Sequence, residues 1–308
     1  KDKENIFKQP NRLRHPLIFY YGHTATFFIN KLVLANILPN RVNKDYESIF
    51  AIGVDEMSWD DLDSKNYTWP TFEQTKAYRD RVKQIVLDLI DTIEFTMPIN
   101  WESPMWIILM GIEHENIHIE TSSVPLRELK IKFMSDEELF EYKDDAKQEY
   151  PRNELVEVKG GEVVLEKDRQ NPIYYGWDNE FSYHKAYIND FEASKYLVSN
   201  GEFLEFVKEG GYNKPEFFSD EGKEWLDFTQ AKHPTFWIKK EGRYYLREIN
   251  RVVPLPLNYP VDVNVYEAEA FCKYLSSKLG YEVRLPSEDE YYRLYDYTNA
   301  GQKEANIG

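Results

Sequence analysis

Two histidines with helical spacing, His114 and His118, are the strongest candidates for chemistry in this sequence. On a helix, residues four apart project from one face, one turn above the other. The same stripe carries Ile107, Met110, Gly111 and Thr121. Both imidazoles would therefore point into a packed interior, where a ring without a partner is costly. Because a metal is the commonest partner for two histidines at this spacing, we expect a metal site here.

Two other interpretations of these histidines stay open at this point. The string His-Glu-x-x-His matches zinc metalloproteases, in which the glutamate, here Glu115, acts as the general base. That hydrolase needs a third ligand, and the sequence has no Gly-x-x-His after His118, which counts against a metzincin. The simpler alternative is a pair of core histidines that hydrogen-bond to their neighbours.

A third histidine, His23, lies on a separate predicted helix. The pattern from Leu17 to Leu38 is helical, opens at His15-Pro16 and stops at Pro39-Asn40. The stripe that holds His23 also holds Phe19, Phe27, Asn30 and Leu34. Alone, such a residue is typical of a satisfied core histidine. Three inward histidines on two long helices favour a shared metal instead.

The next predicted helices complete a bundle around these rings. Thr71 and Gln74 form a capping box that starts a helix running to about Phe95, with Arg79 in its early turns. Arg79 could be a surface cation or a clamp for a carboxylate. Ser103-Pro104 starts the helix of His114, which should run to about Val124, where Pro125 interrupts it. With a short acidic helix over 136–147, this predicts an antiparallel four-helix bundle with a metal in its core.

The second half of the chain has a different character. Residues 156–191 alternate apolar and polar with turn signals, which is typical of strands. Short helices are expected from Phe203 to Val207, from Val265 to Leu279, and from Ser287 to about Tyr295. We therefore predict two domains, residues 1–147 and 148–308, whose fold class is mixed: an α-helical bundle and then an α/β domain.

Composition limits the possible partners. The 308 residues carry a formal net charge of −16, which disfavours binding to nucleic acid because phosphate backbones would be repelled. No apolar run reaches the roughly 18 residues that a membrane span needs. The single cysteine, Cys272, has no partner for an internal disulfide. These features predict a cytoplasmic protein without a membrane segment.

Several stretches together resemble the nonheme iron sulfoxide synthases. The first half is similar to their DinB-like helical iron-binding domain in 15–24, in the acidic loop 53–61 and in 111–123. The second half resembles the formylglycine-generating-enzyme-like (sulfatase-modifying-factor) domain, which has a C-type-lectin-like fold. This likeness rests on 197–203, 210–212, 260–261, 267–272 and 284–290. The loop 53–61 and Thr121-Ser122-Ser123 resemble the ovothiol branch, 5-histidylcysteine sulfoxide synthase.

The resemblance implies a site and a reaction. Its motif of one distant histidine followed by His-x-x-x-His-x-Glu assigns His23, His114 and His118 as Fe(II) ligands, with Glu120 as a group behind the ligands. Arg79 would bind a substrate carboxylate. The substrates would be L-cysteine, L-histidine and O2. Members of the family continue past residue 308, so the resemblance implies a lectin-like domain that is incomplete at its C-terminus and an active-site tyrosine beyond the chain end.

Three alternatives to the ovothiol reaction remain open. An ergothioneine-type synthase would join hercynine to cysteine or γ-glutamylcysteine. A zinc hydrolase would use Glu115 and would need no O2. A metal-binding bundle without catalytic activity, responsive to thiols and joined to a ligand-binding lectin-like domain, would take up no O2 with any thiol.

Overall fold

The chain forms two compact units. The computed structural model describes residues 3–52, 67–135, 142, 145–168 and 175–298. The first unit comprises Lys1–Asp136 and Glu166–Ser182, and the second comprises Glu137–Leu165 and Tyr183–Gly308. The segment from Glu166 to Ser182 thus belongs with the helices, although it follows the first strands in the sequence. The domain limits 1–147 and 148–308 remain a prediction.

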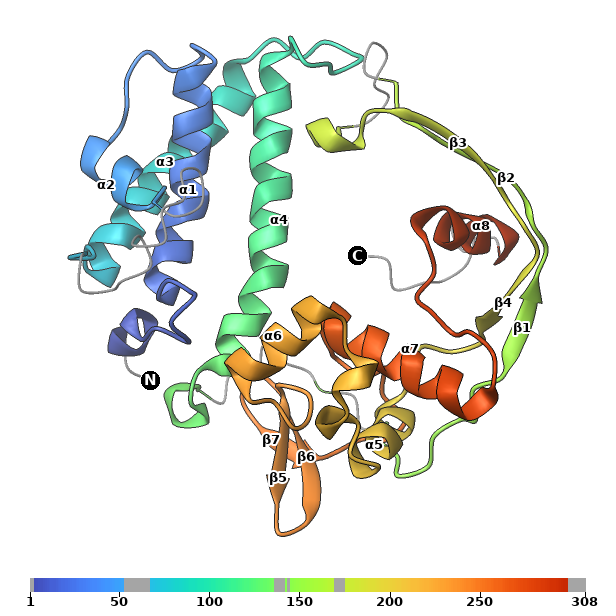
Figure 1. The fold of residues 1–308 in the computed structure, drawn as a ribbon. Coiled ribbons are helices and arrows are strands. Elements are labelled where there is room, and N and C mark those ends of the chain that lie inside the picture. The colour runs from blue at the N-terminus through green and yellow to red at the C-terminus, as the bar shows by residue number, and fades with distance from the viewer. Residues whose placement is uncertain (1–2, 53–66, 136–141, 143–144, 169–174, 299–308) are drawn as a thin grey trace. The chain divides into compact units, whose positions relative to one another are not determined.

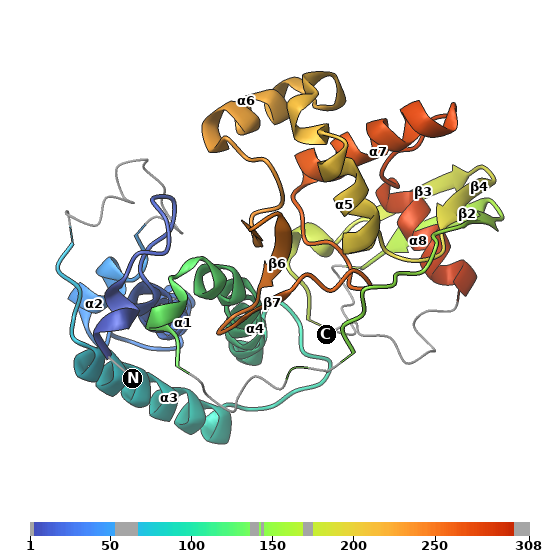
Figure 2. The same ribbon diagram turned by 90° about the horizontal axis from the view of Figure 1, so that it is seen from below.

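The first unit consists of helices. Its long helices are α1 (Leu17–Leu34), α3 (Phe72–Thr92) and α4 (Pro104–Glu128), and Figure 1 shows them side by side. The shorter elements are η1 (Lys3–Phe7), α2 (Lys44–Ile49), η4 (Ile131–Phe133) and η5 (Asp178–Glu180). Helix α1 packs against both α3 and α4, as the second view in Figure 2 also shows. This central helix is therefore the one that can present side chains to both neighbours.

Local signals explain where these helices begin. The predicted capping box of α3 is present: the backbone N–H of Thr71 donates to Gln74 and that of Gln74 donates to the Thr71 hydroxyl. Asn43 caps α2 by accepting from the N–H groups of Asp45 and Tyr46. Sequence periodicity did not predict α2 because one and a half turns are too short for a repeating stripe.

The core of the first unit lies on both sides of α1. Ala25 and Ile29 pack with Tyr78 and Val82 of α3, and Leu32 packs with Met105 and Ile108 of α4. At the contact with α4, a Cβ added to Gly111 would lie 2.0 Å from the Phe28 ring. Only glycine therefore permits α1 and α4 to approach this closely.

Two predicted helix ends differ from the structure. Helix α1 ends at Leu34 rather than Leu38, because Asn36 adopts a left-handed conformation with φ 57°. Helix α4 continues through Pro125 to Glu128, so the predicted interruption is wrong. Pro125 removes one helical hydrogen bond, but Pro125 and Leu129 are both buried, and this packing holds the last turn in place. The acidic helix expected over 136–147 falls mostly outside the described residues.

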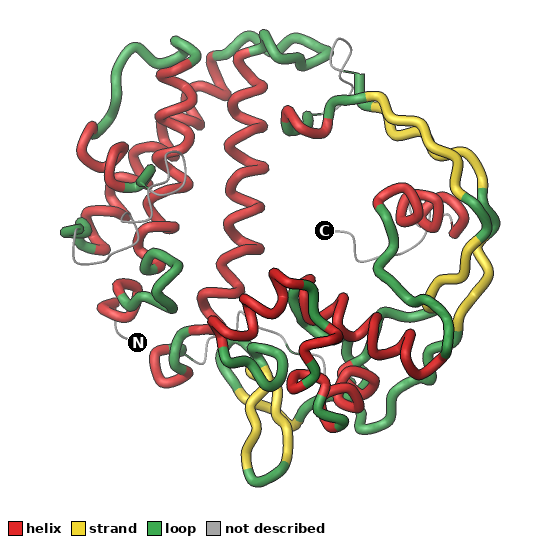
Figure 3. The backbone as a smooth tube through the Cα atoms, viewed as in Figure 1, coloured by secondary structure: helices red, strands yellow, loops and turns green. Residues whose placement is uncertain are grey.

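The second unit combines short sheets with helices. Strand β1 (Leu155–Val158) pairs antiparallel with β4 (Phe191–Ser194), and β2 (Gly161–Glu166) pairs with β3 (Tyr183–Ile188). An antiparallel sheet has the order β5 (Trp237–Lys240), β6 (Arg243–Arg247), β7 (Val252–Pro254). The helices are α5 (Asn200–Lys208), α6 (Asp220–Thr229), α7 (Val265–Leu279) and α8 (Glu288–Thr298), with η6 (Gly211–Asn213) and η7 (Pro215–Phe217) between α5 and α6. Figure 3 shows how much of this unit is loop.

An aromatic core holds the second unit together. Phe203 and Phe206 of α5 contact Phe271 and Tyr274 of α7, with ring centroids 5.2 to 6.1 Å apart. The predicted capping box of α8 is confirmed, since Ser287 and Glu290 exchange hydrogen bonds. Among the described residues of both units, no helix has the length and apolar character needed to cross a bilayer.

Candidate metal centre

Three histidine rings meet between α1 and α4. Nε2 of His114 lies 3.2 Å from Nε2 of His23 and 3.1 Å from Nε2 of His118. One nitrogen from each ring lies within 4.8 Å of the other two. His23 and His114 are buried and His118 is half-buried. The structure thus brings together the three histidines that the sequence had placed on two helices.

The other ring nitrogen of His23 fixes its tautomer. Nδ1 lies 2.7 Å from the carbonyl oxygen of Phe50, so Nδ1 carries the proton and donates it. The Nε2 lone pair of His23 therefore faces the other two rings. Phe50 directly follows α2, whose Glu47 is buried and accepts from the backbone N–H groups of Val42 and Asn43 at 2.8 Å each. Short helix α2 thus positions the carbonyl that orients a candidate ligand.

Aromatic side chains of α1 hold the rings in place. Phe27 stacks on His114 with centroids 3.7 Å apart and planes 9° from parallel. Phe19 stacks on His23 at 5.4 Å, and Tyr20 lies 6.0 Å from the ring of His118. Such contacts limit ring rotation and exclude water from one side of the cluster.

The cluster favours neutral imidazoles. Burial, and then the proximity of His23, lower the pKa of His114 to about 3. The same two causes, in the same order, lower the pKa of His118 to about 4. Neutral rings offer lone pairs, which is the form that binds metals.

These residues fit a metal ion better than they fit one another. The Nδ1 atoms of His114 and His118 are buried and have no hydrogen-bond partner among the described residues. Because a neutral ring carries one proton, no assignment of protons satisfies every nitrogen of the cluster. A cation would accept three Nε2 lone pairs at once. Two nitrogens bound at right angles about 2.1 Å from one metal lie about 3.0 Å apart, which is close to the 3.1 and 3.2 Å observed.

The charged candidates do not point at the cluster centre. Arg79 donates from Nη1 to the carbonyl oxygen of Tyr21 at 2.6 Å and to Oγ1 of Thr24 at 2.5 Å. Its Nη2 lies 2.9 Å from Oε1 of Glu115, in an ion pair. This pairing argues against Glu115 as the base of a hydrolase, because that carboxylate would have to face metal-bound water. Glu120 is exposed, and no hydrogen bond or ion pair connects it to a ring in the described part of the chain.

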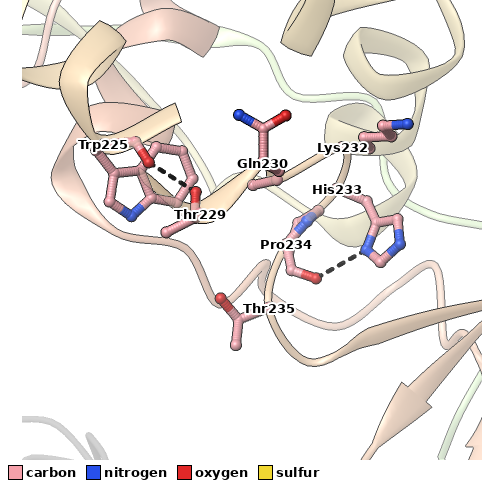
Figure 4. Close-up of a pocket in the computed structure, with 8 residues that line it drawn as sticks. Trp225, Thr229, Gln230, Lys232, His233, Pro234 and Thr235 are labelled. Carbon is pink, nitrogen blue, oxygen red and sulfur yellow. Dashed lines mark hydrogen bonds between the residues drawn. The ribbon is translucent and has the colours of Figure 1, made fainter. Parts of the chain in front are cut away.

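Other regions contribute less. The acidic loop 53–61 lies outside the described residues. The second unit has an open pocket of about 460 Å³ beside the end of α6, between Trp225 and Thr235. Figure 4 shows its one histidine, His233, whose Nδ1 is bonded to the carbonyl of Pro234 at 3.1 Å. Lacking converging ligands among the residues that line it, this pocket is a weaker candidate than the three histidines.

Sequence reasoning missed two features of the site. The Phe50 carbonyl was invisible to it because a backbone oxygen carries no residue signature. The stack of Phe27 on His114 was partly foreseeable, since Phe27 and His23 were placed on one stripe. The Asn43 cap was the available signal for α2 and hence for the position of Phe50.

Comparisons with known proteins agree with this two-part organisation. Residues 141–303 match the sulfatase-modifying factor enzyme 1-like domain, and residues 2–122 match the DinB superfamily. The predicted fold class, a helical DinB-like part followed by a sulfatase-modifying-factor domain, is thereby confirmed.

Curated relatives extend along most of the chain. Ergothioneine biosynthesis protein 1 of Schizosaccharomyces pombe is 22% identical over 96% of this chain and 39% of its own length. The protein of the same name from Neurospora crassa is 22% identical over 98% of this chain and 36% of its own. Hercynine oxygenase of Mycolicibacterium smegmatis is 29% identical over 68% of this chain and 46% of its own. The chain therefore spans less than half the length of these relatives.

Proposed function

This chain belongs to the family of proteins with a sulfatase-modifying factor enzyme 1-like domain, and from that premise we propose that it is a nonheme iron sulfoxide synthase. The observation that carries the proposal is the convergence of His23, His114 and His118 through Nε2. Its pairing with a DinB superfamily match, and with relatives named for ergothioneine biosynthesis, supports the same conclusion.

The donor set suits Fe(II). Three neutral imidazoles can hold one face of the metal and leave the opposite face for substrates, as in the facial sites of nonheme iron oxygenases. Without a carboxylate ligand the site stays more positive, which favours an anionic thiolate. Bound Fe(II) would supply the electrons and the Lewis acidity that O2 activation requires. The protein would orient the ligands through Phe50 and exclude water with the stacked rings of Phe19 and Phe27.

The proposed reaction joins a cysteine sulfur to an imidazole carbon. The thiol loses its S–H proton, the imidazole loses one C–H proton, and a C–S bond forms. The sulfur is then oxidised to the sulfoxide by one oxygen atom of O2. The other oxygen atom leaves as water with the two protons, so the four electrons that O2 accepts are all provided by the two substrates.

Two acceptors are the candidates for this chemistry. The loop 53–61 and Thr121-Ser122-Ser123 favour L-histidine, with 5-histidylcysteine sulfoxide as the product, as in ovothiol biosynthesis. The printed names of the relatives favour hercynine at least as strongly, with cysteine or γ-glutamylcysteine as the donor. Both acceptors carry the same imidazole, so the proposed metal chemistry is common to them.

Oxygen consumption would test the proposal. The chain is reconstituted with Fe(II) without air and then mixed with O2, cysteine and either L-histidine or hercynine. We expect rapid O2 uptake only when thiol and acceptor are both present, and a coupled product whose mass equals the sum of donor, acceptor and one oxygen atom less two hydrogens. The acceptor with the higher kcat/KM identifies the branch.

The matched control is His184→Ala, which alters an exposed histidine of the second unit and should leave O2 uptake unchanged. A coupled product with zinc in place of iron, or uptake no faster than that of cysteine with free Fe(II), would contradict the proposal. Peptide hydrolysis by the zinc-loaded chain would favour the hydrolase instead.

A further inference from the structure

Arg79 connects three helices beside the histidine cluster. It lies on α3, its Nη1 donates to two oxygens of α1, and its Nη2 pairs with Glu115 of α4. The guanidinium also lies over the Tyr21 ring, with Cζ 4.7 Å from the centroid. Because guanidinium is planar and rigid, these contacts fix the direction of each acceptor relative to the others.

The acceptors of Arg79 flank the candidate ligands in the sequence. Thr24 directly follows His23 on α1, and Glu115 directly follows His114 on α4. A shift of α4 along α1 would break the ion pair and change the distance between Nε2 of His23 and Nε2 of His114. The contact therefore restrains the register that brings these rings together.

The exposure of the pair is consistent with a structural contact. The side chain of Arg79 is 25% exposed and that of Glu115 is 37% exposed, so both are partly removed from solvent. Nη1 uses both of its N–H groups on α1, which leaves less of the guanidinium for a bidentate grip on a substrate carboxylate.

We propose that Arg79 is a positioning residue that holds His23 and His114 in register through Thr24 and Glu115, in place of the substrate-carboxylate role expected from the sequence. This inference deepens the proposed metal centre and rests on it. Arg79 contacts neither a ring of the cluster nor the space between the rings, and it acts through the two helices that carry them.

Metal affinity would measure this role without turnover. Co(II) is titrated into the metal-free chain and followed by its visible absorption. Arg79→Gln and Glu115→Gln should each weaken Co(II) binding about tenfold, as for groups that orient metal ligands. The double variant should bind no more than about twofold more weakly than either single variant, since both remove one contact. Arg79→Lys should recover only part of the affinity, because one ammonium cannot reach both helices.

Arg81→Gln is the matched control, since Arg81 is an exposed arginine two positions further along α3, and its Co(II) affinity should equal that of the wild type. A substrate-binding Arg79 would give the opposite pattern, with Co(II) affinity unchanged and a raised KM for cysteine in Arg79→Gln alone. That result would overturn the inference.

Thermal unfolding of the metal-free variants separates this inference from the proposed function. Arg79→Gln and Glu115→Gln should each lower the melting temperature, and their effects should be less than additive. If the wild type binds no Co(II), the metal centre fails, but this coupling still decides whether the Arg79–Glu115 contact holds the helices together. Fully additive effects on melting would refute it.

Discussion

His114→Phe is expected to weaken binding of Fe(II) or Co(II) at least 100-fold while leaving the metal-free fold intact. Loss of a group that merely orients a ligand weakens metal sites by roughly 10- to 100-fold, and His114 is a candidate ligand whose Nε2 lies between the other two. Phenylalanine keeps the ring that stacks on Phe27. It also removes two buried nitrogens that no described residue satisfies. Isothermal titration with Co(II) gives the affinity.

Denaturant unfolding of the metal-free protein provides the second measurement. The unfolding free energy of His114→Phe should stay within about 1 kcal/mol of the wild type, because the ring is conserved in size and the hydrogen bonds lost are poor. The same exchange at exposed His184 should change neither quantity. An affinity that His114→Phe leaves unchanged would show that the three rings do not share a metal.

Gly111→Ala is expected to lower the unfolding free energy by about 2 kcal/mol and to weaken metal binding at the same time. Alanine in a helix interior is ordinarily favoured over glycine by about 1 kcal/mol. Here the new Cβ would lie 2.0 Å from the Phe28 ring, so α1 and α4 must move apart or Phe28 must leave its place. The steric cost should exceed the gain in helix propensity. Because His23 and His114 lie on these two helices, their separation would increase as well.

A compensating variant tests this explanation. Phe28→Ala removes the ring that the new methyl group meets, so Gly111→Ala combined with Phe28→Ala should be more stable than the sum of the two single effects predicts. Chemical denaturation gives the free energies and Co(II) titration gives the affinity. If Gly111→Ala proves more stable than the wild type, the close approach of α1 to α4 at this glycine is wrong.

The sequence by itself determined the long helices, their starts and the three histidines. Residues four apart on a helix share a face whatever surrounds them, so His114 and His118 could be paired without a structure. The capping boxes of α3 and α8 depend on three-residue spacings and were readable for the same reason. The chemistry at stake was therefore foreseeable from local spacing.

Only the tertiary structure decided how the rings meet and what Arg79 does. The hydrogen bond from His23 to Phe50 joins residues 27 positions apart, and the ion pair of Arg79 with Glu115 spans 36. Helix periodicity gives the face of each residue, but it does not give the register of one helix against another. That register is set by packing, such as Phe28 on Gly111. Long-range packing of this kind leaves no fixed spacing in the sequence, which is why the roles of Phe50 and Arg79 emerged only from the fold.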